Sequence, residues 1–207
     1  HDTYGNLIRT LTPDTTAGIQ REYWDLNHKD LEGIASARGR GFGLGGPPVV
    51  PGNYVAKLTV KGSSYTQLFS VIDDHRIDIN ISDRKAWTAK LMQIGEFYND
   101  LTGELSKMAA LQAHLAKLDR SKTNYDKVAG DEIKDVIGLY GELMSRTRGL
   151  YYGAQGWMGL LTQDQELQFI YYQEMLVKLK PKQAKMMSVL VKKLNKSVKK
   201  EERYTAQ

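Results

Sequence analysis

The pattern of hydrophobic and polar positions changes its period once along the chain, near residue 80. Residues 54–60 and 65–71 alternate between apolar and polar side chains, the period of a strand with one buried face. Between them, Lys61 to Ser64 predict a turn in which Gly62 takes a positive φ. The pattern therefore predicts an antiparallel hairpin over residues 47–71, which completes a small β domain.

The first residues predict a hairpin turn that has only part of its hairpin. Residues 3–6 are typical of a tight turn and residues 7–11 of the strand that leaves it, but only two residues precede the turn. Either a strand is missing or another polypeptide supplies it, and an open sheet edge attracts pairing. We therefore expect partner contacts at Leu7, Ile8 and Arg9.

Residues 21–26 predict a further strand, with Trp24 as a core aromatic residue, because large rings dominate small β cores. A glycine-rich run follows at residues 38–46. A phosphate-binding loop would place its glycines at the start of a helix, and the two prolines that come next exclude it. A short RGG-like nucleic-acid segment stays an alternative, and a flexible connection between strands is favoured.

After a short strand or linker over residues 77–82, apolar residues recur at threes and fours, the period of amphipathic helices. A first helix of about 35 residues is expected, with Ser82 or Asp83 as its N-cap. A helix of that length needs a partner to bury its apolar stripe. A second helix is expected over residues 131–148.

A turn rich in glycine and aromatic residues is expected over residues 149–159. Thr162 and Gln165 form a capping-box pattern that begins a third helix. Pro181 is expected either to end this helix or to open a fourth, because proline suits the first turn of a helix. Short connections favour antiparallel neighbours, so the helical region is expected to form an antiparallel bundle or hairpin.

The chain has 207 residues and no cysteine, which excludes disulfides and thiolate chemistry. No apolar run approaches the roughly 20 residues of a membrane helix, so no transmembrane segment is expected. The sequence begins at His1 without a recognisable signal peptide. We expect an N-terminus that is processed or cut from a longer protein.

The net charge of +5 is unevenly distributed. Residues 178–207 hold nine lysines and one arginine against two glutamates, a net charge of +8, and the rest of the chain has a net charge of −3. Such a region can contact an anionic surface or nucleic acid, whereas the solvated face of a terminal helix is the simpler interpretation. The candidate contacts are Lys192, Lys193, Lys196, Lys199 and Lys200.

No pattern in the sequence predicts a catalytic, cofactor-binding or metal-binding residue. The four histidines lack metal-site spacing, and Asp73 to His75 with Asp78 is better interpreted as a polar hinge than as a calcium loop. Glu96 and Asp100 lie one helical turn apart, which is typical of solvated charge rather than of a glycosidase pair. Aromatic residues suggest a partner or sugar contact, or the closed ends of a bundle. These are Tyr151, Tyr152, Trp157, Tyr171 and Tyr172.

Two parts of the sequence resemble known proteins. Residues 6–11 followed by Tyr23-Trp24-Asp25-Leu26 are similar to an Ig-like domain related to the flagellar hook-cap protein. Residues 51–60, with Tyr65-Thr66-Gln67 and Val71, resemble the hairpin near the C-terminus of secreted bacterial sortilin-type, BNR-repeat β-propeller proteins, often labelled glycosyl hydrolases. The resemblance covers roughly residues 3–120.

That family continues with an Asp-Pro-Arg stretch and a helical tail. Here Asp73-Asp74-His75-Arg76 stands in place of the stretch, so its proline is replaced, and the helical tail follows. The family's propeller lies outside this chain, and so would its catalytic residues. No catalytic residue is therefore carried over.

Together the patterns and the resemblance predict an α+β protein. A small antiparallel Ig-like β-sandwich over residues 1–80, truncated at its N-terminus, precedes a region of about four helices over residues 83–200 and a tail over residues 201–207. The expected function is a non-catalytic interaction or structural module of a secreted, periplasmic or cell-surface β-propeller protein. It would pack on the propeller or dock into a larger assembly, with a glycan as a further expected ligand. One alternative is that the chain is part of a glycan-acting hydrolase whose catalytic residues lie in the propeller. A second alternative is binding to an anionic surface or nucleic acid through the Lys-rich C-terminal helix.

Overall fold

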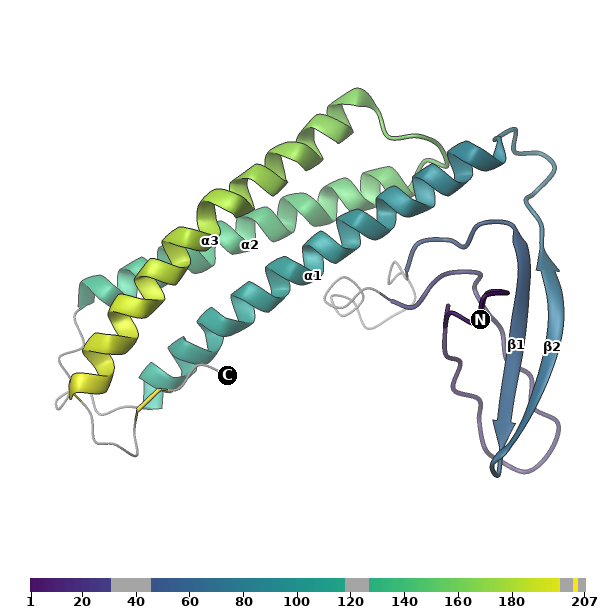
Figure 1. The fold of residues 1–207 in the computed structure, drawn as a ribbon, viewed down its shortest axis with the longest axis horizontal. Coiled ribbons are helices and arrows are strands. Elements are labelled where there is room, and N and C mark those ends of the chain that lie inside the picture. Colours follow the sequence, from purple (N-terminus) through teal and green to yellow (C-terminus); the bar gives the residue numbers. More distant parts are fainter. Residues whose placement is uncertain (31–45, 118–126, 198–202, 205–207) are drawn as a thin grey trace. The chain divides into compact units, whose positions relative to one another are not determined.

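The computed structural model describes residues 1–30, 46–117, 127–197 and 203–204. Its elements, in chain order, are β1 (Gly52–Val60), β2 (Ser63–Val71), α1 (Ile81–Lys117), α2 (Lys127–Gln155) and α3 (Gln163–Ser197) (Figure 1). The prediction of an α+β protein is confirmed: a two-stranded antiparallel sheet accompanies three helices. The described residues do not form a full Ig-like sandwich.

The chain divides into two compact units. The first contains residues 1–95 and 151–162, and the second contains residues 96–150 and 163–207. The sheet and the first turns of α1 belong to the first unit, together with the last residues of α2. Most of the helical residues belong to the second unit. The predicted glycine-rich loop over residues 38–46 lies outside the described residues, apart from Gly46.

The hairpin is the best-predicted element of the first unit. Gly52 pairs with Val71 at one end and Val60 with Ser63 at the other, so all nine residues of each strand are in register. Lys61 and Gly62 connect the strands with φ angles of 48° and 84°. Two positive φ angles give the turn a twist that matches the right-handed twist of the strands, which explains why glycine stands at the second position.

A small aromatic core packs against one end of the hairpin. Tyr54 is buried with Ile8 and Val49, and Trp24 and Phe69 cover this cluster. The Trp24 ring meets the rings of Tyr54 and Phe69 edge-on, with centroids 5.6 and 6.0 Å away. Edge-to-face pairs are a favourable arrangement of aromatic rings. The prediction that Trp24 is a core residue is therefore confirmed.

The strands predicted over residues 7–11 and 21–26 are wrong, because neither segment joins a ladder. The isolated bridges nearby involve residues outside both segments, Asp2 with Tyr54 and Asn27 with Pro48. The backbone oxygen of Ile8 accepts the N–H of Lys29 at 2.8 Å instead of a strand partner. Residues 77–82 also form no strand. The predicted turn at residues 3–6 is confirmed, because the Gly5 N–H donates to the Asp2 carbonyl at 3.2 Å.

Gly46 allows two backbone segments of the first unit to approach closely. A Cβ atom at this position would lie 2.2 Å from the carbonyl oxygen of Lys29 and 2.6 Å from that of His28. No side chain fits there without a backbone shift. The approach lets the His28 N–H donate to the Pro47 carbonyl at 2.9 Å, which positions the Pro48 region beside Asn27.

The N-cap of helix α1 lies two or three residues before the predicted caps. Asn80 is the N-cap, because its Oδ1 atom accepts the N–H of Asp83 at 2.8 Å and its carbonyl accepts the N–H of Arg84 at 3.0 Å. The expectation of Ser82 or Asp83 as N-cap is wrong, since both already lie in the helix. The predicted stripe is confirmed in large part. Its buried members are Trp87, Leu91, Ile94, Tyr98, Leu101, Met108 and Leu111.

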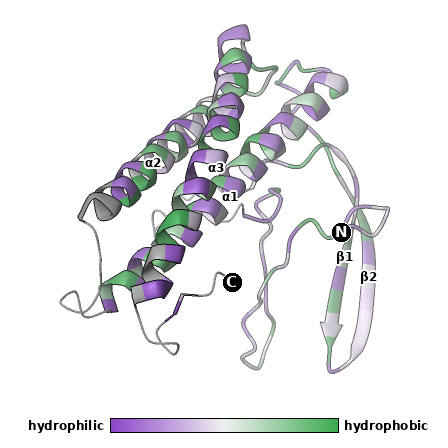
Figure 2. Cartoon of the chain, turned by 60° about the vertical axis from the view of Figure 1, so that its left-hand side comes forward, coloured by the Kyte–Doolittle hydropathy of each residue, from purple (hydrophilic) through white to green (hydrophobic). Residues whose placement is uncertain are grey.

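The described residues form three helices where about four were expected. Helix α2 continues to Gln155, through the glycines that predicted a turn. Helix α3 runs through Pro181 without ending. On α3, the apolar residues Leu167, Ile170 and Tyr171 are exposed and lie off the buried face. Its buried members are Phe169, Tyr172, Leu176, Leu179, Gln183 and Met186. Figure 2 shows apolar and polar residues interspersed along all three helices, as amphipathic packing requires.

The second unit is held by apolar stripes and by a buried polar contact. The Phe97 and Phe169 rings pack edge-on with centroids 5.6 Å apart. The Tyr140 hydroxyl donates to Oε1 of Gln183, and Nε2 of Gln183 reaches the Glu104 carbonyl at 3.3 Å. Burial raises the pKa of Tyr140 to about 12, with a further contribution from the charge of Glu104. Neutral Tyr140 therefore links α2 to α3, and α3 in turn contacts α1.

Candidate functional site

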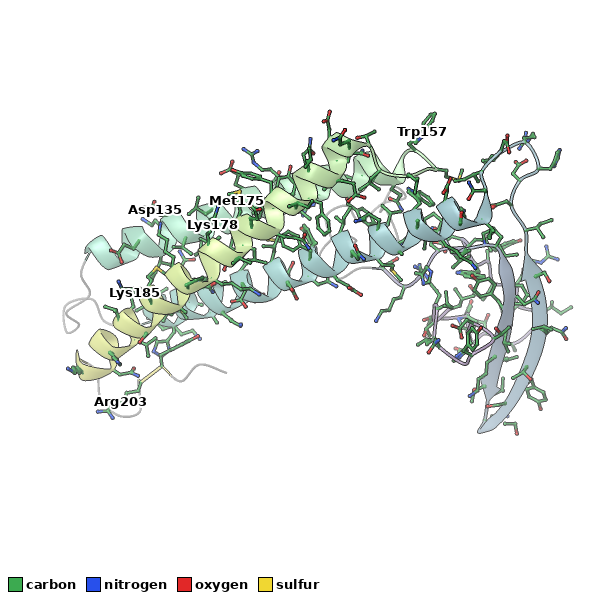
Figure 3. The ribbon with its side chains drawn as sticks, turned by 45° about the horizontal axis from the view of Figure 1, so that its top comes forward. Asp135, Trp157, Met175, Lys178, Lys185 and Arg203 are labelled. Atoms are coloured by element: carbon green, nitrogen blue, oxygen red, sulfur yellow. The ribbon has the colours of Figure 1, made fainter. Side chains whose placement is uncertain are left out.

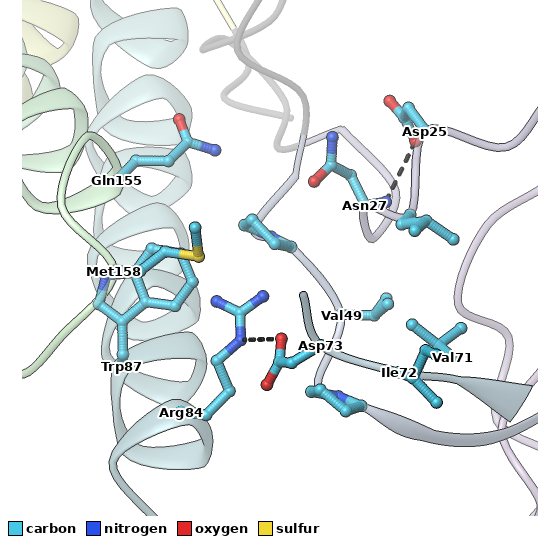
Figure 4. Close-up of a pocket in the computed structure, with 13 residues that line it drawn as sticks. Asp25, Asn27, Val49, Val71, Ile72, Asp73, Arg84, Trp87, Gln155 and Met158 are labelled. Atoms are coloured by element: carbon cyan, nitrogen blue, oxygen red, sulfur yellow. Dashed lines mark hydrogen bonds and ion pairs between the residues drawn. The ribbon is translucent and has the colours of Figure 1, made fainter. Parts of the chain in front are cut away.

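A pocket of about 310 Å³ lies in the first unit, beside the first turns of α1 (Figure 4). Five segments that are distant in sequence line it: residues 25–27, residues 48–51, the end of β2, the start of α1 and the end of α2 with the following turn. Its volume is at the lower end of the range for small-molecule sites. Most of its lining is apolar, with Val49, Ile72 and Met158 among the walls.

Arg84 is the most unusual residue of this pocket. It is only 6% exposed, and its Nε and Nη1 atoms are buried without a hydrogen-bond partner in the described part of the chain. Two weaker contacts compensate its charge. Asp73 places Oδ1 3.5 Å from Nε, and the Trp87 ring centroid lies 4.7 Å from the guanidinium carbon. A buried guanidinium with unmet donors is costly unless an acceptor reaches it.

Local structure explains how Arg84 comes to be buried. The Asn80 cap starts the helix, which places Arg84 and Trp87 three residues apart on one face. The Trp87 indole N–H donates to the Ala154 carbonyl at 2.8 Å, which fixes the ring against the end of α2. Asp73 follows β2 by two residues, so the end of the hairpin brings the carboxylate to the arginine.

The remaining polar groups of the pocket differ in how well they are satisfied. Asp25 accepts the Asn27 N–H at 3.1 Å and lies 3.8 Å from the Arg9 guanidinium. Its charge is therefore already partly compensated. Oε1 of Gln155 is buried and lacks a hydrogen-bond partner within the described ranges. Leu26, in the pocket wall, has a φ of 57°, a left-handed conformation that is uncommon for a residue with a branched side chain.

A second feature of the first unit is the outer edge of β1, the edge that faces away from β2. The His1 amino group donates to the Val55 carbonyl at 3.0 Å, and the Val55 N–H donates to the His1 carbonyl at 2.9 Å. Residues of a strand point their backbone groups alternately to its two sides. Lys57 and Thr59 therefore point to the same side as Val55, and none of the described residues pairs with them there.

The far half of the hairpin lacks a covering layer among the described residues. Tyr54 is buried, but Leu58, Val60 and Tyr65 on the same face are 54, 46 and 63% exposed. The expectation that the whole alternating face would be buried is wrong beyond Tyr54. The small aromatic core is wide enough to cover only one end of the nine-residue strands.

The residues predicted to contact partners lie in different environments. Ile8 is in the aromatic core, and Arg9 donates to the His28 carbonyl at 2.9 Å and pairs with Asp30 at 2.6 Å. Leu7 is exposed. Leu7 therefore faces solvent, whereas Ile8 and Arg9 already have partners within the first unit. A contact role for the three remains a prediction.

The aromatic residues predicted to contact a partner also differ in their exposure to solvent. Tyr151 is fully buried and its ring packs on Tyr152, with centroids 6.1 Å apart. Burial is the main cause that raises the pKa of Tyr151. Trp157 is 76% exposed. Of these residues, Trp157 offers the largest free ring.

Of the five lysines predicted to contact an anionic surface, Lys192 and Lys196 are exposed on α3. The side chain of Lys193, and Lys199 and Lys200 as a whole, lie outside what the structure describes. In the described ranges no group of three or more His, Asp or Glu residues is placed to hold a metal ion. No helix in those ranges has the length and apolar character needed to cross a bilayer.

Sequence reasoning missed Arg84, although a signal was available. Arg84 lies in line with Trp87 and Leu91 of the predicted stripe, at spacings of three and four, so it falls on the buried face. In the predicted polar hinge at Asp73 to His75, the two aspartates have different partners. Asp73 faces Arg84, whereas Asp74 pairs with Arg76, whose guanidinium holds the pKa of Asp74 below its usual value.

Comparisons of the chain with protein-family models, with curated proteins and with solved structures find no match.

Proposed function

We propose that this chain is a non-catalytic interaction module that binds an extended strand of a protein partner along the outer edge of β1. The observation that carries this proposal is the pairing of His1 with Val55. It begins an antiparallel ladder on that edge, and the next backbone groups, at Lys57 and Thr59, have no partner among the described residues.

Two physical arguments support strand addition at this edge. A two-stranded hairpin is at best marginally stable by itself, and a third strand is the usual remedy. Unpaired N–H and C=O groups in a row are a template for such a strand. Each added hydrogen bond is worth about 1 kcal/mol. An added strand would also place side chains beside Leu58 and Val60, which are half-exposed.

The family resemblance suggests where the strand comes from. In this proposal the partner is the rest of a secreted or cell-envelope bacterial β-propeller protein, and its strand extends the hairpin toward an Ig-like sandwich. If the parent protein acts on glycans, catalysis resides in the propeller. Removing residues 1–207 from such a parent would then leave glycan cleavage intact while its assembly is lost.

A peptide titration tests strand addition directly. The probe is the acetylated and amidated peptide SSYTQLFSV, the sequence of Ser63–Val71, which already pairs with β1 on its other side. We expect saturable changes in the amide NMR signals of Lys57 and Thr59. The amide signals of Ala56 and Leu58, which face β2, should change less.

Two matched proline variants distinguish the edges of the hairpin. Thr59→Pro removes an N–H from the outer edge of β1, whereas Thr66→Pro removes one from the outer edge of β2, and neither N–H serves the β1–β2 ladder. Thr59→Pro should abolish peptide binding and Thr66→Pro should preserve it. Equal binding by both variants, or no saturable binding by the wild-type protein, would contradict the proposal.

A second candidate function rests on a stripe of lysines along α3. Residues 175–200 contain no acidic residue. At about 100° per residue, one face within about 40° of its centre holds the exposed residues Lys178, Lys182, Lys185, Lys192 and Lys196. Figure 3 marks Lys178 and Lys185 on α3. This arrangement favours binding to an anionic membrane surface, where each lysine contributes about 1 kcal/mol.

Vesicles with increasing phosphatidylserine content test this second function. Binding should rise with the anionic fraction and weaken steeply with salt. Lys182→Glu should reduce binding about tenfold or more, whereas Lys180→Glu, on the other side of the helix, should reduce it less. Salt-independent binding, or equal effects of the two substitutions, would exclude the stripe.

A further inference from the structure

We propose that the pocket beside Arg84 binds a small organic carboxylate that carries an apolar body. This inference is independent of the strand-addition proposal, because it rests on different residues of the first unit. The observation behind it is a buried guanidinium group with unmet donors at the wall of a pocket.

The guanidinium needs an acceptor that the described residues do not supply. Arg84 is more than nine-tenths buried, and its Nε and Nη1 atoms have no hydrogen-bond partner among the described residues. Asp73 approaches only Nε, at 3.5 Å, and its side chain is 32% exposed. That distance exceeds the usual length of a charge-assisted hydrogen bond. A ligand carboxylate close to the guanidinium would form the short contact that Asp73 does not make.

The other acid in the pocket does not oppose an anionic ligand strongly. Asp25 lies 3.8 Å from the Arg9 guanidinium and accepts the Asn27 N–H. Two side-chain amides complete the polar part of the pocket. Oε1 of Gln155 is buried with no hydrogen-bond partner in the described ranges, and an amide can rotate to present its N–H₂ group instead. Gln155 and Asn27 thus offer donors for a second carboxylate oxygen.

The remaining walls determine the rest of the ligand. Val49, Ile72 and Met158 offer apolar surface around the polar group (Figure 4). Figure 4 shows the Arg84 guanidinium directed from α1 into the space that Asn27, Gln155 and Met158 surround. A volume of about 310 Å³ restricts the ligand to a small molecule. A short branched-chain carboxylate has both the charge and the shape.

The first test compares two probes that differ in charge. 4-Methylpentanoate is titrated into the intact chain, with 4-methylpentanamide as the neutral probe of the same shape. The reporter is the Trp87 indole N–H signal, since this group lies at the pocket with a defined hydrogen bond to Ala154. We expect saturable binding of the carboxylate, and binding of the amide weaker by about tenfold or more.

Three variants establish whether the pocket is responsible. Met158→Trp fills the pocket while Arg84 itself is retained, and it should abolish carboxylate binding. Arg84→Gln should weaken it about tenfold or more. Asp73→Asn removes the competing carboxylate, so it should strengthen the binding of 4-methylpentanoate. The affinity for 4-methylpentanamide should stay unchanged. An Arg84–Asp73 pair that is only structural would not produce that gain.

Several results would overturn the proposal. These are equal binding of the two probes, carboxylate binding that survives Met158→Trp, weaker carboxylate binding by Asp73→Asn, and the lack of saturable carboxylate binding by the wild-type chain. Because neither Met158 nor Asp73 belongs to the β1 edge, these outcomes do not depend on peptide binding to Lys57 and Thr59.

Discussion

Trp87 joins two segments of the first unit through a single buried hydrogen bond. It is 1% exposed, and its indole N–H donates to the Ala154 carbonyl at 2.8 Å. Trp87→Phe removes that donor and leaves a cavity, so we expect it to lower the free energy of unfolding by about 2–4 kcal/mol. Urea denaturation followed by far-UV circular dichroism measures the change.

The matched control for this substitution is Trp157→Phe, because Trp157 is 76% exposed. It should change the free energy of unfolding by less than about 0.5 kcal/mol. Equal effects of the two substitutions would mean that the Trp87 hydrogen bond does not stabilise the first unit.

The raised pKa of Tyr140 leads us to expect a loss of stability at alkaline pH. Its pKa in the folded chain is raised from 10.0 to about 12, mainly by burial. Below pH 10 the tyrosine is neutral in both states and its contribution is constant. Between pH 10 and about 12 the unfolded chain releases a proton that the folded chain retains, so the free energy of unfolding falls as the pH rises.

Tyr140→Phe tests this dependence. The variant should lose about 1 kcal/mol at pH 8, because Gln183 loses the hydroxyl donor. Its free energy of unfolding should then fall less steeply than that of the wild type between pH 10 and 12. Part of the slope should remain, since burial also raises the pKa of Tyr151. Parallel slopes for the two proteins would contradict the assignment to Tyr140.

The burial of Arg84 could be predicted from the sequence, but the residues around it could not. Its place on the apolar stripe indicates burial, but the partners that surround it come from residues 25–27, 73 and 155–158. Sequence spacing cannot bring these segments together, because their approach depends on how the hairpin end and the α2 end meet the first turns of α1. The pocket could therefore be identified only from the three-dimensional structure.

Among the secondary-structure elements, α3 allows the clearest test, because it contains a proline. Pro181 lies within the helix, where it has no N–H to donate to the carbonyl four residues earlier. Because the residue is exposed, Pro181→Ala should raise the free energy of unfolding by about 1–3 kcal/mol. The measurement is thermal and urea unfolding beside Lys180→Ala, an exposed neighbour expected to change stability by less than about 0.5 kcal/mol. Destabilisation by Pro181→Ala would contradict an uninterrupted helix.

Elements with a long, regular pattern were predictable, and short ones were not. The hairpin combines nine-residue alternation with a Lys-Gly turn, and the helices repeat apolar residues over many turns. Residues 7–11 and 21–26 offer at most three alternations each, and their backbones pair with loops instead. Pro181 misled the prediction because proline signals the end of a helix far more often than it is tolerated inside one.

Over the chain as a whole, apolar burial is concentrated in the helices. Most of the fully buried large side chains lie on α1 and α2, whereas the hairpin contributes only Tyr54 to the buried core. Open backbone groups and half-exposed apolar side chains occur together in β1. This contrast places the expected partner surface on the hairpin rather than on the well-packed helical stripes.

Amide hydrogen exchange at Lys57 and Thr59, with and without the SSYTQLFSV peptide, is the most direct measurement of this account. Without peptide, both amides should exchange rapidly, while those of Ala56 and Leu58 are protected by β2. With saturating peptide, exchange at Lys57 and Thr59 should slow about tenfold or more. Exchange that stays equally fast at both amides in the presence of peptide would show that the outer edge of β1 does not accept a strand.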